Sequence, residues 1–67
     1  MEIIKEVQYP TRAAAFDASQ TQSIETIFGS LPRDAYVYLA DDNKIVAAHV
    51  GRDAYPADEV FFMGRSA

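Results

Sequence analysis

The sequence offers one candidate for acid–base chemistry, His49, which is the only histidine in the chain. Histidine is the side chain that ordinarily changes charge near neutral pH, and a hairpin would place Tyr36 across from it. An enzyme built on this pair would also need a nucleophile and a group that stabilises developing charge, and the sequence shows neither. We therefore interpret His49 as a strand residue packed beside an aromatic ring, and we predict no catalytic residue and no enzymatic activity.

Closely spaced oxygen donors occur at Asp41, Asp42 and Asn43, and such donors suit a hard cation such as Ca²⁺. The EF-hand pattern also requires a glycine at its sixth position and a glutamate at its twelfth, where this chain has Val46 and Arg52. Asp and Asn also tolerate the positive φ angles of tight turns. We therefore favour a hairpin turn over a calcium loop, and we predict neither a metal nor a cofactor.

Length and charge limit the classes of function. With 67 residues the chain is predicted to form one small domain, residues 1–67, in which a single hydrophobic core gives little margin of stability. Ten acidic and six basic residues give a net charge of −4, which disfavours direct binding to nucleic acid because phosphates attract Lys and Arg. The amino terminus, MEIIKEVQYP, lacks the apolar run of a signal peptide or membrane span, and cysteine is absent. These features predict a soluble, cytoplasmic protein.

The first predicted strand covers residues 2–9, where polar and apolar residues alternate imperfectly. Ile3 and Val7 fall on one side of this strand. Lys5 falls on the same, nominally inner side, which is a feature of edge strands because charges there discourage unwanted pairing. Pro10 ends the run. The sequence therefore predicts a half-buried strand at the edge of a sheet.

The helical part of the sequence follows. Residues 12–16 are ambiguous, because three alanines favour a helix while the short length equally allows a brief strand or an extended lead. The clearest helical spacing belongs to four apolar residues: Ile24, Ile27, Phe28 and Leu31. Two capping boxes are available at the start of this helix, Ser19 with Gln22 and Asp17 with Gln20. Gly29 and Pro32 provide a stop, so we predict one helix of about three turns.

The strongest structural signal is a β-hairpin in residues 36–50, with Asp42 and Asn43 as a two-residue turn. This register pairs Leu39 with Val46, Val37 with Ala48 and Ala35 with Val50 on a core face, and Tyr36 with His49, Tyr38 with Ala47 and Ala40 with Ile45 on the other face. The second face would then carry more apolar area than a solvated sheet requires, from Tyr36, Tyr38, Ile45 and one of Phe61 or Met63. We therefore predict that this face binds a partner or a second copy.

Residues 51–59 have the Gly, Pro and Asp content of a loop, and residues 60–63 form a predicted last strand. Phe61 and Phe62 must point to opposite faces of that strand. The whole chain is thus predicted to be an α+β domain: a three- or four-stranded, mainly antiparallel sheet with one helix packed on one face.

Acidic residues are frequent in the second half of the chain, at Asp41, Asp42, Asp53, Asp58 and Glu59. Carboxylates at one or both ends of the sheet would match a basic groove and compete with nucleic acid for its Lys and Arg side chains. Tyr36 and Tyr38 are predicted to anchor the same contact, because tyrosine is enriched at protein interfaces. The predicted partner is therefore a protein.

In size, acidity, lack of cysteine and absence of catalytic motifs, the whole chain resembles the small phage-encoded inhibitors of bacterial defence, including anti-CRISPR proteins. No motif carries this resemblance, and it assigns no residue. It implies an inhibitor in the host cytoplasm that occupies a surface of a nucleic-acid-binding defence complex, with carboxylates in the place of phosphates. The alternative is a homodimeric structural or regulatory protein that buries the Tyr36 and Tyr38 face against its own copy.

Overall fold

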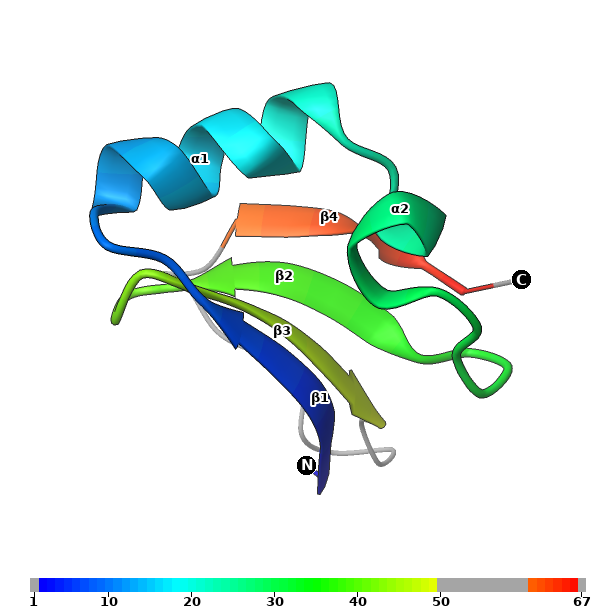
Figure 1. Ribbon diagram of the computed structural model, residues 1–67. Coiled ribbons are helices and arrows are strands. Elements are labelled where there is room, and N and C mark those ends of the chain that lie inside the picture. Colours follow the sequence, from blue (N-terminus) through cyan, green and yellow to red (C-terminus); the bar gives the residue numbers. More distant parts are fainter. Residues whose placement is uncertain (1, 50–60, 67) are drawn as a thin grey trace.

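The computed structural model describes residues 2–49 and 61–66, which form a four-stranded antiparallel sheet with two short helices on one face (Figure 1). The strands are β1 (Glu2–Gln8), β2 (Tyr36–Ala40), β3 (Lys44–His49) and β4 (Phe61–Arg65), and the helices are α1 (Arg12–Thr21) and α2 (Ile24–Phe28). The strand order is β1-β3-β2-β4, so β1 and β4 are the edges of this described sheet. The predicted α+β class is confirmed, but two helices replace the predicted one.

Helix α1 begins earlier than the sequence pattern indicated. The hydroxyl of Thr11 caps it by accepting a hydrogen bond from the Ala14 amide at 3.0 Å. The ambiguous residues 12–16 are therefore helical. Both predicted capping boxes are wrong, because Asp17 and Ser19 lie inside α1, where their amides already belong to helical turns.

Helix α2 is a separate and shorter element. Ser23 caps it, since its hydroxyl accepts a hydrogen bond from the Thr26 amide at 3.0 Å. Gly29 ends it with a φ of 74°, a left-handed conformation that glycine adopts without strain, so the predicted stop is confirmed. The predicted three turns shrink to five residues, and Leu31 lies beyond the helix.

The β2–β3 hairpin has a three-residue loop, residues 41–43, in place of the predicted two-residue turn. Asn43 has a φ of 65°, which is the left-handed conformation that closes three-residue hairpin loops. The extra loop residue shifts β3 by one position, so Leu39 faces Ile45 and not Val46. Since side chains alternate between faces, every predicted cross-strand pair within residues 36–49 is corrected. The predicted pair of Ala35 with Val50 lies outside the described residues.

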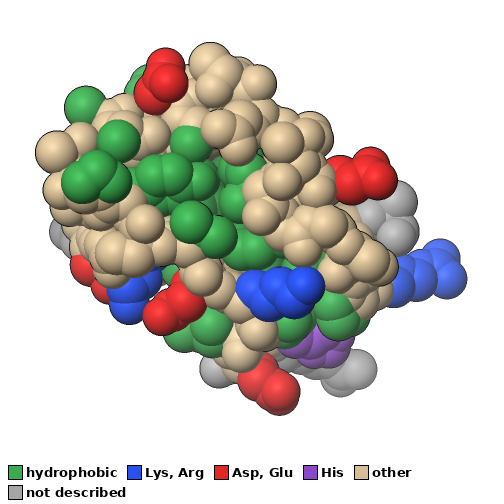
Figure 2. All heavy atoms as spheres, viewed as in Figure 1, with side chains coloured by type: hydrophobic (Ala, Val, Ile, Leu, Met, Phe, Trp, Pro, Cys, Tyr) green, Lys and Arg blue, Asp and Glu red, His purple; other side chains and the backbone are tan. Residues whose placement is uncertain are grey.

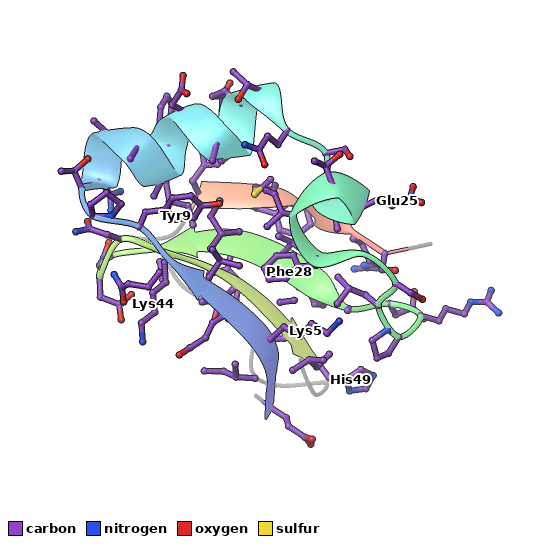
Figure 3. The ribbon with its side chains drawn as sticks, in the orientation of Figure 1. Lys5, Tyr9, Glu25, Phe28, Lys44 and His49 are labelled. Carbon is purple, nitrogen blue, oxygen red and sulfur yellow. The ribbon has the colours of Figure 1, made fainter. Side chains whose placement is uncertain are left out.

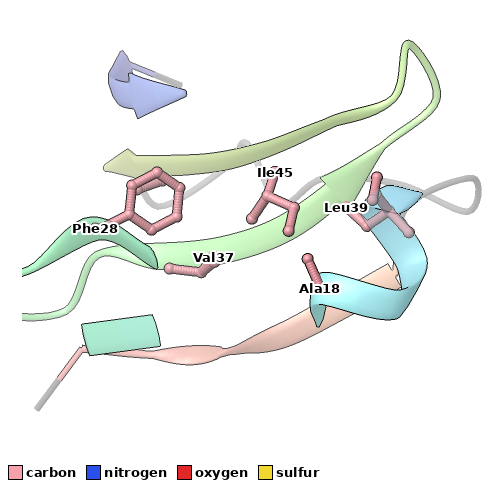
Figure 4. Close-up of a cluster of buried hydrophobic side chains, with 7 residues drawn as sticks. Ala18, Phe28, Val37, Leu39 and Ile45 are labelled. Carbon is pink, nitrogen blue, oxygen red and sulfur yellow. The ribbon is translucent and has the colours of Figure 1, made fainter. Parts of the chain in front are cut away.

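The helix face of the sheet holds the larger hydrophobic core (Figure 4). Its buried side chains come from both helices and the two central strands: Ala15, Ala18, Phe28, Val37, Leu39, Ile45 and Ala47. The small alanines let α1 approach the sheet closely, while Phe28 of α2 fills the space beside Val37. Hydrophobic side chains also reach the surface between α1 and α2, where charged groups lie mainly around the rim (Figure 2).

The opposite face of the sheet is buried at its centre as well. Tyr38 is 5% exposed, Val46 3% and Ala48 0%, and the three form a second hydrophobic cluster. The predicted exposed patch is therefore wrong for Tyr38, which is buried, and for Ile45, which belongs to the helix face. It is also wrong for Phe61 and Met63, because Phe61 pairs with Leu39 and Met63 packs against the helix-face core. The central hairpin thus contributes to a core on each side of the sheet.

The edge strand β1 contains an irregularity between Ile3 and Lys5, which places these two residues on opposite faces of the sheet. Ile3 pairs with Ala48, and Lys5 pairs with Ala47 on the helix face. The Lys5 ammonium donates a hydrogen bond to the carbonyl of Phe28 at 3.3 Å, near the end of α2 (Figure 3). The prediction of an edge strand with a lysine on its inner face is confirmed, but Ile3 lies on the opposite face and not on the side of Lys5 as predicted.

Candidate functional site

The structure describes four of the seven predicted partner-binding residues, and it does not bring those four together. Tyr36 begins β2, whereas Asp41 and Asp42 follow the end of that strand, about 16 Å away at the rise of a β-strand. Tyr38 between them is buried. Three predicted residues, Asp53, Asp58 and Glu59, lie outside the described residues. The two aspartates are therefore considered separately from the tyrosines.

Carboxylates from two segments meet where the β2–β3 hairpin turns. The Lys44 ammonium lies 3.3 Å from the Glu6 carboxylate of β1 and 3.4 Å from the Asp42 carboxylate of the hairpin loop. Asp41 lies 3.7 Å from the guanidinium of Arg12, at the start of α1. We call Glu6, Asp41 and Asp42 the acidic hairpin end. Its cations come from the same chain, so the end is negatively charged but partly neutralised.

Glu6 is the member of this group that sequence reasoning missed. It pairs with Val46 across the β1–β3 ladder, two positions from the Gln8–Lys44 pair that closes the ladder. The sequence marked residues 2–9 as a strand but gave no sign of which strand would lie beside it. Only the β1-β3-β2-β4 order brings Glu6 beside the hairpin loop.

The same carboxylates affect two neighbouring groups. Burial, followed by the negative charges of Asp42 and Glu6, raises the pKa of the Tyr38 hydroxyl above its usual 10.0. Hydrogen bonds to Glu6 and then to Asp42 raise the pKa of Lys44 above its usual 10.5. Tyr38 is therefore neutral and Lys44 positively charged at neutral pH.

These two shifts predict a loss of stability in alkaline solution. A group whose pKa is raised by folding binds its proton more tightly in the folded state, so its contribution is fully present below the unfolded pKa and is lost as pH rises through the folded pKa. We therefore expect the free energy of unfolding to fall as the pH is raised from about 9 to about 12, a window that includes the usual values of both groups.

Urea denaturation, followed by circular dichroism at several pH values, measures this loss. The Tyr38→Phe variant keeps the ring but cannot ionise, so its stability should fall less steeply than that of the natural chain over the same pH range. The natural chain is the matched reference at each pH. Parallel pH profiles for the two proteins would contradict the assignment to Tyr38.

His49 does not form the predicted pair with Tyr36. Tyr36 pairs with Ala48, and His49 is exposed at the end of β3, where it pairs with Glu2 of β1. The one-residue shift at the hairpin loop is the cause. Lys44 and His49 lie at opposite ends of β3, so His49 is also remote from the acidic hairpin end (Figure 3).

A pocket of about 410 Å³ lies between α2 and the end of β4, with Ile24, Glu25 and Arg65 among its lining residues. None of the predicted site residues lines it. The Arg65 guanidinium also lies over the Tyr36 ring, 4.5 Å from its centroid, and donates a hydrogen bond to the Tyr36 hydroxyl. One polar group of this pocket, the Arg65 guanidinium, is thus already bound to Tyr36 of the neighbouring strand β2.

Across residues 2–49 and 61–66, no three His, Cys, Asp or Glu side chains are grouped so that they could hold a metal ion. Neither α1 nor α2 is long and apolar enough to cross a membrane. Comparisons with family models, curated proteins and solved structures found no match to this chain. Its function is therefore inferred from its own surface.

Proposed function

We propose that the protein is a non-catalytic inhibitor that binds a basic surface of another protein through its acidic hairpin end. The position of Lys44 supports this proposal, because carboxylates from β1 and from the hairpin loop converge on its ammonium at 3.3 and 3.4 Å. Glu6 and Asp42 thus already form a binding position for one cation. A Lys or Arg side chain of a partner would meet the same two carboxylates.

Exchange of the internal cation for a partner's cation would cost little. The Glu6 and Asp42 side chains are 44% and 61% exposed, and exposed ion pairs contribute only about 0–1 kcal/mol. The same holds for Arg12 and Asp41, which are both more than half exposed. These carboxylates are therefore accessible to a partner, and the net charge of −4 favours encounter with a basic one.

A groove that binds nucleic acid is the partner surface of matching chemistry, because its Lys and Arg side chains are placed to bind phosphates. The most specific form of the proposal is an anti-CRISPR-like protein that blocks such a groove on a bacterial defence complex. Asp53, Asp58 and Glu59 add three carboxylates from the sequence. Tyr36, at the opposite end of β2, is still proposed to contact the partner. Tyr38 is not proposed as an anchor because it is buried.

Tyr38 and Lys44 are not tuned for proton transfer near neutral pH. General acids and bases are usually tuned toward the working pH. The two resolved shifts here move the pKa of Tyr38 and the pKa of Lys44 upward, away from neutrality. Each serves to keep one charge state fixed at neutral pH.

Neutralising the acidic hairpin end with Glu6→Gln, Asp41→Asn and Asp42→Asn is expected to weaken partner binding at least tenfold, since two or three charge-assisted contacts are lost. The assay is a pull-down from nuclease-treated bacterial lysate with the tagged protein, in which captured nucleic-acid-binding proteins are identified by mass spectrometry and displaced with duplex DNA. Lys44→Gln should act in the opposite direction, because it removes the competing internal cation.

The matched control is Glu2→Gln, Asp17→Asn and Asp34→Asn, which removes the same charge from other exposed positions. It should retain most of the binding. Equal losses in the two triple variants would reduce the effect to net charge and refute the assigned site. Capture that duplex DNA does not displace would refute competition with nucleic acid.

A further inference from the structure

Edge strand β4 carries exposed aromatic rings on both faces of the sheet. Phe61 packs edge-on against Phe16 of α1, with ring centroids 5.8 Å apart, and Phe62 lies on the other face, 5.7 Å from the Tyr36 ring. This confirms that Phe61 and Phe62 point in opposite directions. Phe16, Phe61 and Phe62 are 46%, 41% and 45% exposed, and we call them the aromatic edge. The fourth exposed large hydrophobic residue of the described chain is Ile3, on β1.

The two edges of the sheet differ in how they discourage pairing. β4 is joined to β2 on one side, and no other strand in residues 2–49 and 61–66 pairs with its outer side. Among its five residues only Arg65 is charged, and that side chain is held over Tyr36. β1 instead carries three charged residues, Glu2, Lys5 and Glu6, and charges protect natural edge strands. Each edge strand has one irregularity in its pairing, so the charges distinguish the two edges. Among the described strands, β4 is therefore the less protected edge.

We propose that β4 pairs antiparallel with β4 of a second copy of this chain, about a two-fold axis perpendicular to the sheet. The two sheets would then form one continuous eight-stranded sheet, with all four helices on the same face. In Figure 1, β4 lies at the edge beneath α1, so the two α1 helices would approach each other across the new strand pair. This dimer would use the β4 edge of the sheet, whereas the homodimer considered from the sequence would use the face that carries Tyr36 and Tyr38.

A second copy fits this edge because the strand is complementary to itself. Phe62 and Arg65 share one face of the sheet, since both contact Tyr36. With the two-fold axis between Met63 and Gly64, Phe62 of each copy lies opposite Arg65 of the other, an arrangement that permits two cation–π contacts. Met63 then lies opposite Gly64, which has no side chain to oppose it.

Area and charge also favour this occupant. At their exposed fractions the three rings leave roughly 80 Å² each, if an aromatic side chain has about 200 Å² to bury. Complete burial of these rings in two copies would remove at most about 500 Å² of aromatic surface from water, roughly half of the apolar area in a standard interface of about 1,600 Å². Phe61 pairs with Leu39 near the hairpin loop, whereas Arg65 pairs with Tyr36 at the far end. Antiparallel pairing therefore separates the two acidic hairpin ends and brings each nearer an Arg65.

The test is the molar mass of the full chain by sedimentation equilibrium from about 1 µM to 1 mM, for the natural sequence and for two lysine variants. Phe62→Lys should raise the dimer dissociation constant at least tenfold, because it removes one ring from each copy and places a new positive charge opposite Arg65 of the other copy. Ile3→Lys is the matched control, since it places the same charge at an exposed position of the other edge, and it should leave the constant within about twofold. Circular dichroism checks that both variants fold.

Hydrogen exchange identifies the surface that is used. Amides of residues 61–65 should become more protected as the concentration of the natural chain rises, while those of residues 2–8 should not. A monomer at every concentration would overturn the proposal, as would a dimer that Phe62→Lys leaves intact. Protection of residues 61–65 by an extended peptide, in a chain that stays monomeric, would assign the edge to a different partner and refute the dimer.

If Phe62→Lys misfolds, Phe16→Ser at the edge of the same surface replaces it. The acidic hairpin end is not needed for this dimer, so either proposal can fail alone.

Discussion

Replacing Ile45 by alanine is expected to remove most of the stability of the fold. Ile45 is 0% exposed and lies in the helix-face core opposite Leu39. Isoleucine-to-alanine changes at such positions cost about 2–5 kcal/mol, because apolar contacts are lost and a cavity is left. A domain of this size rarely has more than about 3–5 kcal/mol of stability in total. Urea denaturation followed by circular dichroism should therefore show a midpoint near zero denaturant.

Ile3→Ala provides the control for this prediction. It deletes the same atoms from a side chain that is 52% exposed, and such surface changes usually stay within about 0.5 kcal/mol. Equal effects of Ile45→Ala and Ile3→Ala would show that Ile45 is not a core residue.

Replacing Tyr38 by alanine is expected to cost about 3–5 kcal/mol, in the range of large aromatic deletions from a core. Tyr38 is 5% exposed and packs with Val46 and Ala48 on the sheet face opposite the helices. Thermal and urea denaturation of the isolated protein measure the loss. The sequence had suggested a binding role for this residue, in which case its removal would spare stability and abolish binding.

Tyr36→Ala separates these two roles. Tyr36 is less buried than Tyr38, although it contacts Phe62 and Arg65, so we expect a cost of about 1 kcal/mol from its lost ring contacts. A stable Tyr38→Ala protein with a destabilised Tyr36→Ala protein would reverse the assignment. It would mean that the second face has its centre at Tyr36.

The hairpin shows why element types were easier to predict than their registers. Residues 36–50 contain two runs of β-forming residues around a turn signal, which was enough to predict both strands. Asp42 and Asn43 suit both a two-residue turn and the end of a three-residue loop, since both loops need a left-handed residue. Both faces of the hairpin are apolar, so hydrophobic alternation could not choose between the registers.

The first half of α1 is ambiguous in the sequence because the buried face of this helix is made of small residues. Only Ala15 and Ala18 are buried in it, whereas Phe16, its one large apolar residue, points outward to Phe61. The helical stripe that the sequence did show, from Ile24 to Leu31, spans α2 and the segment after it. The spacing of large apolar side chains therefore located α2 but predicted a helix that is longer than α2.

The candidate site was predicted only in part, because some of its residues are far apart along the chain. Asp41, Asp42 and Lys44 are close together in the sequence, but the proximity of Arg12 and of the third carboxylate, Glu6, is not visible there. Arg12 and Glu6 come from segments about 30 residues away along the chain. Their proximity depends on strand order, which local patterns do not specify. The same limit hid the aromatic edge, since Phe16 and Phe61 meet across 45 residues.

A hairpin buried on both faces also constrains how this sequence can diverge. In a half-solvated strand every second position accepts polar residues, and mutations accumulate there. In β2 and β3 both alternating sets are buried at the centre of the sheet, from Val37 to Leu39 and from Ile45 to Ala48. Neutral drift is therefore directed to β1, the exposed side of α1 and the hairpin loop. Related chains should keep an apolar central hairpin while their surfaces become unrecognisable to one another.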